Sequence, residues 1–122
     1  MKAMTDKKSW VEPKIYDKNP NMLVPYYLMH SYLYYKEDSP IISDGEYDSI
    51  CKRLHSEWDN VEHFHKHLID KEMLIAGTGY TLEYPNRVID AAKLLKEMES
   101  IVLKINQYLG YDFNTVELAV RD

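Results

Sequence analysis

A proline-containing turn followed by a helix start divides the first half of this chain into two short helices. Pro40 disfavours helical geometry in the residue before it, so the preceding helix should end near Asp38. Ser43 is an N-cap candidate, and Glu46, three positions later, completes a capping box. These signals predict a helix-turn-helix over residues 22–58, with helices at 22–36 and 44–57.

The longest predicted helix spans residues 86–108 and opens after Pro85. It carries an apolar stripe at helical spacing, formed by Val88, Ile89, Ala92, Leu95, Met98 or Glu99, Val102, Ile105 and Leu109. We expect this stripe to be core, with a helix–helix interface to a partner as the alternative. The predicted fold class is all-α: a small helical domain in which the helix-turn-helix of residues 22–58 packs on a long C-terminal helix.

The remaining segments give weaker signals. Residues 1–21 contain Pro13 and Pro20 and are expected to form an irregular N-terminal arm, followed by a single helical domain over 22–122. Residues 70–84, which include Gly77 and Gly79, are interpreted as a loop. In the tail, Asn114 marks another candidate helix start.

Composition excludes several classes of function. The net charge is −5 and the Lys and Arg residues are scattered, so we expect no autonomous nucleic-acid binding. Cys51, the single cysteine, lies on the apolar side of its helix and indicates a buried thiol in a reducing compartment. No apolar run approaches membrane-spanning length, and the first ten residues do not resemble a signal peptide. We therefore expect a cytoplasmic protein that does not contact membranes.

A small polar constellation stands at the start of the second helix. Asp44, Tyr47 and Asp48 fall on one helical face, and Tyr34 and Tyr35 end the preceding helix across the turn. Packing alone does not require two carboxylates and a phenol there. The alternative is structural: both aspartates complement the helix macrodipole, and Tyr47 belongs to the core.

The same residues carry a family resemblance. The sequence Tyr32-Leu-Tyr-Tyr-Lys-Glu-Asp-Ser-Pro-Ile-Ile-Ser-Asp-Gly-Glu-Tyr-Asp48, continued through Arg53-Leu-His-Ser-Glu57, resembles the N-terminal subdomain Ia of NAD-dependent DNA ligases. The resemblance covers residues 26–58 and implies a site for the nicotinamide mononucleotide half of NAD. It also suggests a stand-alone homologue, encoded by a phage and serving DNA replication and repair.

Site residues follow from that resemblance one by one. Tyr34 matches the aromatic residue that lies against the nicotinamide, and Asp44, Tyr47 and Asp48 match the group that faces nicotinamide and ribose. Tyr35 stands where many of these ligases have His, and a phenol cannot become cationic near neutral pH. The resemblance therefore implies a weaker contact to the nucleotide phosphate in this chain.

The adenylating lysine of the ligases has no counterpart here. Their nucleophile sits in a Lys-x-Asp-Gly motif, whereas Ile42 stands two residues before the only Asp-Gly of this chain, Asp44-Gly45. We expect a non-catalytic module that binds nicotinamide mononucleotide or NAD, alone or in trans with an adenylation subunit. Two alternatives remain: a helical protein–protein interaction protein that lost the ligand, and a small NAD- or nucleotide-processing enzyme with Asp44 or Asp48 as general base.

Residues 61–69 hold three histidines. His63 and His67 would share a face of a helix, with Asp70 three residues beyond His67, so a zinc site can be drawn. This spacing is common by accident, and we expect a solvated helix face and no metal. The expected partners are an adenylation subunit, another nucleic-acid enzyme, or further copies of the chain.

Overall fold

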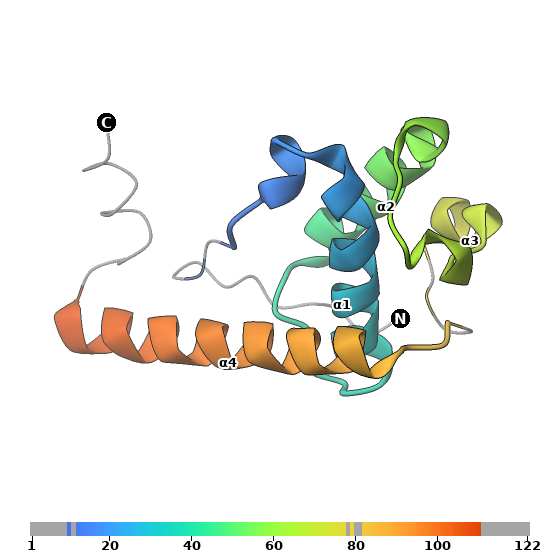
Figure 1. Ribbon diagram of the computed structural model, residues 1–122. Coiled ribbons are helices and arrows are strands. Elements are labelled where there is room, and N and C mark those ends of the chain that lie inside the picture. The colour runs from blue at the N-terminus through green and yellow to red at the C-terminus, as the bar shows by residue number, and fades with distance from the viewer. Residues whose placement is uncertain (1–9, 11, 78, 80–81, 111–122) are drawn as a thin grey trace.

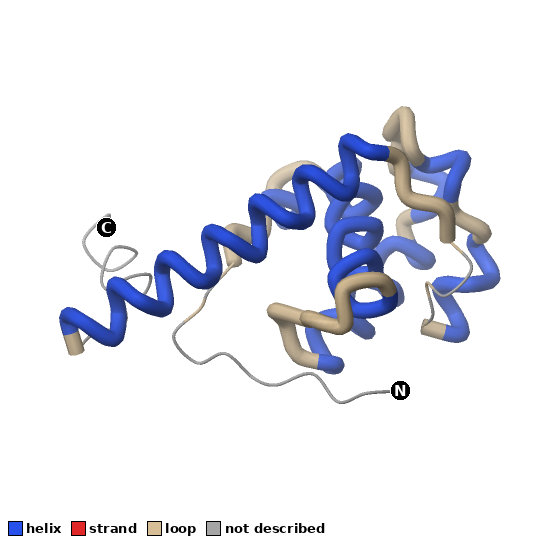
Figure 2. Tube along the Cα trace, turned by 90° about the horizontal axis from the view of Figure 1, so that it is seen from below, coloured by secondary structure: helices blue, strands red, loops and turns tan. Residues whose placement is uncertain are grey.

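The computed structural model describes residues 10, 12–77, 79 and 82–110. In these ranges every regular element is a helix, which confirms the all-α prediction (Figures 1 and 2). The α-helices are α1 (Leu23–Tyr35), α2 (Asp44–Ser56), α3 (Lys71–Ala76) and α4 (Asn86–Leu109). Short 3-10 turns accompany them: η1 (Ile15–Asp17), η2 (Pro20–Met22), η3 (Trp58–Asn60) and η4 (Lys66–Leu68). Within the same ranges, no helix combines the length and apolarity needed to cross a bilayer.

Helix α1 is the centre of the fold. Ten of its thirteen residues are buried, in keeping with a sequence that is apolar on nearly every side, and it contacts both α2 and α4. It ends at Tyr35, a little before the predicted boundary. Asp38 then takes a left-handed conformation (φ 50°), and the Ser39 amide donates a 2.8 Å hydrogen bond back to the Leu33 carbonyl. This reversal sends the chain directly into α2.

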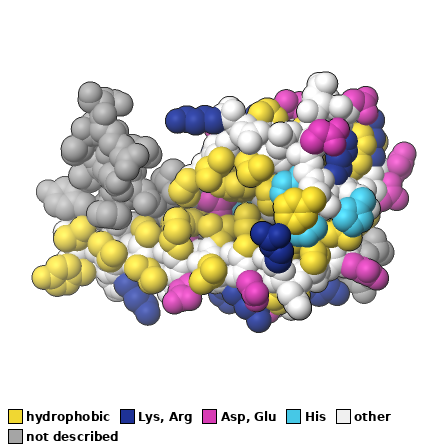
Figure 3. Space-filling model, in the orientation of Figure 1, with side chains coloured by type: hydrophobic (Ala, Val, Ile, Leu, Met, Phe, Trp, Pro, Cys, Tyr) yellow, Lys and Arg dark blue, Asp and Glu magenta, His cyan; other side chains and the backbone are white. Residues whose placement is uncertain are grey.

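Helix α4 crosses α1 with its first half and extends beyond it with its second half (Figure 1). Val88, Ala92 and Val102 are buried as predicted. The prediction is wrong for Ile105 and Leu109, which are exposed although Val102 and Asn106 in the same half of α4 are buried, so a different face of the helix is covered from the one predicted. Figure 3 shows hydrophobic side chains gathered along the part of α4 that extends beyond α1.

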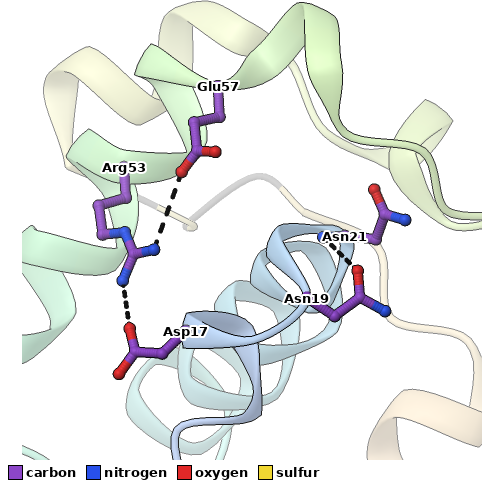
Figure 4. A network of polar contacts seen from close by, with 5 residues as sticks. All are labelled: Asp17, Asn19, Asn21, Arg53 and Glu57. Atoms are coloured by element: carbon purple, nitrogen blue, oxygen red, sulfur yellow. Dashed lines mark hydrogen bonds and ion pairs between the residues drawn. The ribbon is translucent and has the colours of Figure 1, made fainter.

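The N-terminal arm is attached to the helices by specific contacts. Tyr16 in η1 is buried, and the guanidinium of Arg53 on α2 lies 5.2 Å from the centre of its ring. Arg53 Nη1 also lies 2.6 Å from an Asp17 carboxylate oxygen, while its Nη2 lies 3.8 Å from Glu57 (Figure 4). The Asn21 side chain accepts a 2.8 Å hydrogen bond from the Glu62 amide.

A buried acid–base pair makes a second attachment. Glu12 Oε2 lies 2.7 Å from Nε2 of His30 on α1, and both side chains are almost fully buried. A buried polar group costs free energy when it loses its partner, so each of these two residues depends on the other.

We predict that Glu12→Ala lowers the free energy of unfolding by about 1–3 kcal/mol, because it leaves a buried imidazole nitrogen without its partner. Urea unfolding followed by circular dichroism measures the change. Glu62→Ala is the control, since Glu62 is exposed, and should change stability by less than about 0.5 kcal/mol. Equal effects of the two substitutions would contradict the assignment.

The interpretation of residues 70–84 as a loop is wrong at its start, where α3 forms. The Asp70 carboxylate caps this helix by accepting a 3.1 Å hydrogen bond from the Glu72 amide, and Gly77 ends it in a left-handed conformation (φ 65°). Leu74 is buried and α3 packs on α2. Both capping residues are visible in the sequence, but six residues are too few to show a helical period.

The histidine segment is not an α-helix, which corrects the face predicted for His63 and His67. The chain there is irregular apart from η4. The rings of His63 and His65 both contact the ring of Phe64, with centroid distances of 4.4 Å from His63 and 4.2 Å from His65. Among the described residues, no three His, Cys, Asp or Glu side chains gather as metal ligands.

Candidate functional site

The turn between α1 and α2 builds the start of α2 as predicted. Ser43 is extended (φ −73°, ψ 162°), and its hydroxyl accepts a 3.1 Å hydrogen bond from the Glu46 amide. Asp44 occupies the first turn of the helix, where the unpaired backbone amides favour negative charge. Capping therefore fixes the position at which the polar face of α2 begins.

A depression of about 390 Å³ lies between the start of α2 and the end of α3. Such a volume is within the range of small-molecule sites, about 300–1,000 Å³. Its lining consists of Asp44, Gly45, Tyr47, Asp48, Ala76 and Gly77. The structure thus brings together three of the five predicted site residues and adds three that the sequence analysis missed, which are Gly45 on α2, Ala76 at the end of α3 and the C-cap Gly77. If Asp70 and Gly77 had been interpreted as helix caps in the sequence, they would have predicted a helix that ends at this depression.

Tyr47 is the buried part of this lining. Its hydroxyl lies 2.7 Å from Ser31 Oγ on α1, and its ring stacks on Tyr27 with centroids 6.0 Å apart. Burial raises the pKa of the Tyr47 phenol far above its ordinary value, so the side chain is neutral at any physiological pH. The alternative interpretation, in which Tyr47 belongs to the core, is correct for this residue, and Tyr47 lines the depression as well.

Tyr34 and Tyr35 are not among the lining residues. The Tyr34 ring is buried behind Tyr47, with centroids 6.4 Å apart, and the half-buried Tyr35 ring meets it edge to face at 4.7 Å. The three tyrosines therefore form one continuous group of rings, of which Tyr47 reaches the depression.

Two charged side chains lie at the rim of the depression. Asp44 and Asp48 are both exposed, and Asp48 Oδ2 lies 2.9 Å from Lys52 Nζ one turn further along α2. The hydrogen bond to Asp48 raises the pKa of Lys52. Because both partners are open to solvent, this ion pair contributes little to stability and can open when a ligand arrives.

The segment that contains the start of α2 matches a known protein family. Residues 20–72 match the model of the DNA ligase-like, N-terminal NAD+-binding domain. The resemblance to ligase subdomain Ia is confirmed. No curated protein and no solved structure matches the chain.

The matched residues, here called the Ia segment, run from η2 to the first turn of α3. They include the histidine-containing stretch, so the prediction that the resemblance ends near residue 58 is wrong. The Ia segment contributes Asp44, Tyr47 and Asp48 to the depression, whereas Ala76 and Gly77 lie just after it. Helix α4 also lies outside it.

We predict that Ser31→Ala lowers the free energy of unfolding by about 1–3 kcal/mol, since it removes the partner of the buried Tyr47 hydroxyl. Chemical denaturation measures the loss, with Ser49→Ala on the exposed face of α2 as the control. A change no larger than that of the control would show that the Tyr47 hydroxyl finds another partner.

Proposed function

We propose that the depression between α2 and α3 binds the nicotinamide mononucleotide half of NAD, as a module without chemistry of its own. The observation that supports this proposal is the convergence of the motif residues Asp44, Tyr47 and Asp48 on one depression. Side chains that served only to start α2 would not need to share a concave surface with the end of α3.

The residue types suit a pyridinium nucleotide. An oxidised nicotinamide ring is a flat cation, and the two rim carboxylates attract it by Coulomb forces. Either carboxylate can also accept hydrogen bonds from ribose hydroxyls, and such charge-assisted bonds are stronger than neutral ones. Because the Tyr47 hydroxyl already bonds to Ser31, the contribution we assign to Tyr47 is its ring.

Tyr34 and Tyr35 take part in the proposal as the aromatic group behind Tyr47. Direct contact with a nicotinamide requires one of their rings to turn toward the depression, since neither lines it now. Until such a turn occurs, Tyr34 holds the Tyr47 ring in place.

The nucleotide phosphate needs a cation, and we assign this role to Lys52. Tyr35 replaces the histidine of many ligases, whereas the ammonium group of Lys52 stands beside Asp48 at the rim. When the phosphate binds, the exposed Lys52–Asp48 ion pair would be replaced by an exposed ion pair between Lys52 and the phosphate. The adenylating lysine, which the motif around Asp44-Gly45 lacks, would come from a separate adenylation subunit acting in trans.

The two rim carboxylates provide the first test. Asp44→Asn and Asp48→Asn should each weaken binding of nicotinamide mononucleotide at least about tenfold, because the ligand loses a charged partner while the shape is kept. Isothermal titration calorimetry on the full chain measures this, with Asp59→Asn in η3 as the exposed control. Absence of heat from the wild-type protein at millimolar ligand would reject the proposal.

Lys52 allows a second test. Lys52→Ala should weaken nicotinamide mononucleotide binding relative to nicotinamide riboside binding, because the riboside has no phosphate. Lys93→Ala, an exposed lysine on α4, should affect neither ligand. Equal losses for the two ligands would show that Lys52 does not contact the phosphate.

A further inference from the structure

The second half of α4 exposes a row of large apolar side chains. Leu94, Met98, Ile101, Ile105 and Tyr108 retain 65, 40, 50, 38 and 89% of their accessible surface. They recur at alternating intervals of four and three residues, which is the heptad spacing of a coiled-coil seam. We call these five residues the heptad stripe.

This stripe is not the face that packs on the protein's own core. The buried residues of α4 are Val88, Ala92, Glu99, Val102 and Asn106, which form a separate row. From the rotation of 100° per residue, the two rows lie about a third of a turn apart on the helix. The stripe is therefore open along its whole length, including at Leu94, where the helix still lies beside the body.

The heptad spacing of the stripe indicates that its binding partner is another helix. Heptad spacing keeps a seam facing a partner helix along several turns, so knobs from one helix fill holes on the other. The two flanks of the stripe differ. On one side Leu95 and Val102 turn toward the protein's own body, and on the other side Glu97 and Lys104 are exposed.

We propose that the heptad stripe pairs with the same stripe of a second copy, as an antiparallel two-helix coiled coil. Glu97 and Lys104 are one heptad apart and opposite in charge, so an antiparallel pair centred between Glu99 and Ser100 sets each Glu97 beside Lys104 of the second copy. Two-fold symmetry makes this contact twice.

The same register also matches side-chain sizes. Leu94 meets Ile105 of the second copy, Met98 meets its Ile101, and Tyr108 meets its Ala91, the small residue that continues the stripe toward the start of α4. A shift by one heptad in either direction brings Glu97 against Glu97 or Lys104 against Lys104. A parallel pair would set the charged flank of one copy against the apolar flank of the other.

The interface is small, so we expect a reversible dimer with a dissociation constant in the micromolar range. Nothing in the pairing involves the proposed nucleotide site, because none of the residues that line the depression lies on α4. Dimerisation would give an assembly with two such sites.

Sedimentation equilibrium of the full chain tests the pairing. The wild-type protein should approach twice the monomer mass of 14.5 kDa as its concentration rises. Ile101→Asp at the centre of the stripe should leave it monomeric. The matched control is Ile15→Asp, an isoleucine exposed to a similar extent (54%) in η1, which should still dimerise. A wild type that stays monomeric at high concentration, or loss of the dimer in both variants, would overturn the proposal.

Charge exchange tests the antiparallel register and is carried out on folded protein, because both residues are exposed. Glu97→Lys and Lys104→Glu should each weaken dimerisation about tenfold, since each variant sets like charges together twice. The double variant E97K/K104E should restore it. Failure of the double variant to recover the wild-type dissociation constant would overturn the antiparallel arrangement.

Discussion

Helix α1 carries apolar and aromatic side chains on every side, so it is stable only where other segments cover it all round. Helices α2 and α4 both contact it, and the arm that contains Glu12 and Tyr16 packs against it as well. This need for complete cover explains why so short a chain wraps an irregular segment around its own helices. It also aligns α2, because the Ser31–Tyr47 contact joins the two helices at the level of the depression.

The many tyrosines fit such a small core. Each ring contributes apolar area, while its hydroxyl must reach a partner at the edge of the packed region. Tyr26 donates to the Pro13 carbonyl, Tyr32 to Glu37 at 2.9 Å, and Tyr84 to the Gly79 carbonyl at 3.1 Å. The first two bonds link α1 to the segments before and after it, and the third closes the loop before α4; phenylalanine could make none of them.

Sequence reasoning succeeded where local chemistry decides the outcome. The start of α2 follows from Ser43, the start of α4 from Pro85, and burial of Cys51 from its apolar helix face, where burial raises the pKa of the thiol to about 12. It failed where tertiary arrangement decides. Ile105 is exposed whereas its neighbour Asn106 is buried, so packing and not the apolar pattern within α4 selects the face that is covered.

The second wall of the depression is formed by the end of the short helix α3 and its C-cap Gly77. A helix of six residues has too few internal hydrogen bonds to be stable alone, so α3 exists because Leu74 is buried and because Asp70 and Gly77 close its ends. A substitution at Leu74 would therefore loosen one wall of the depression and change its affinity for a ligand without removing any contact to that ligand.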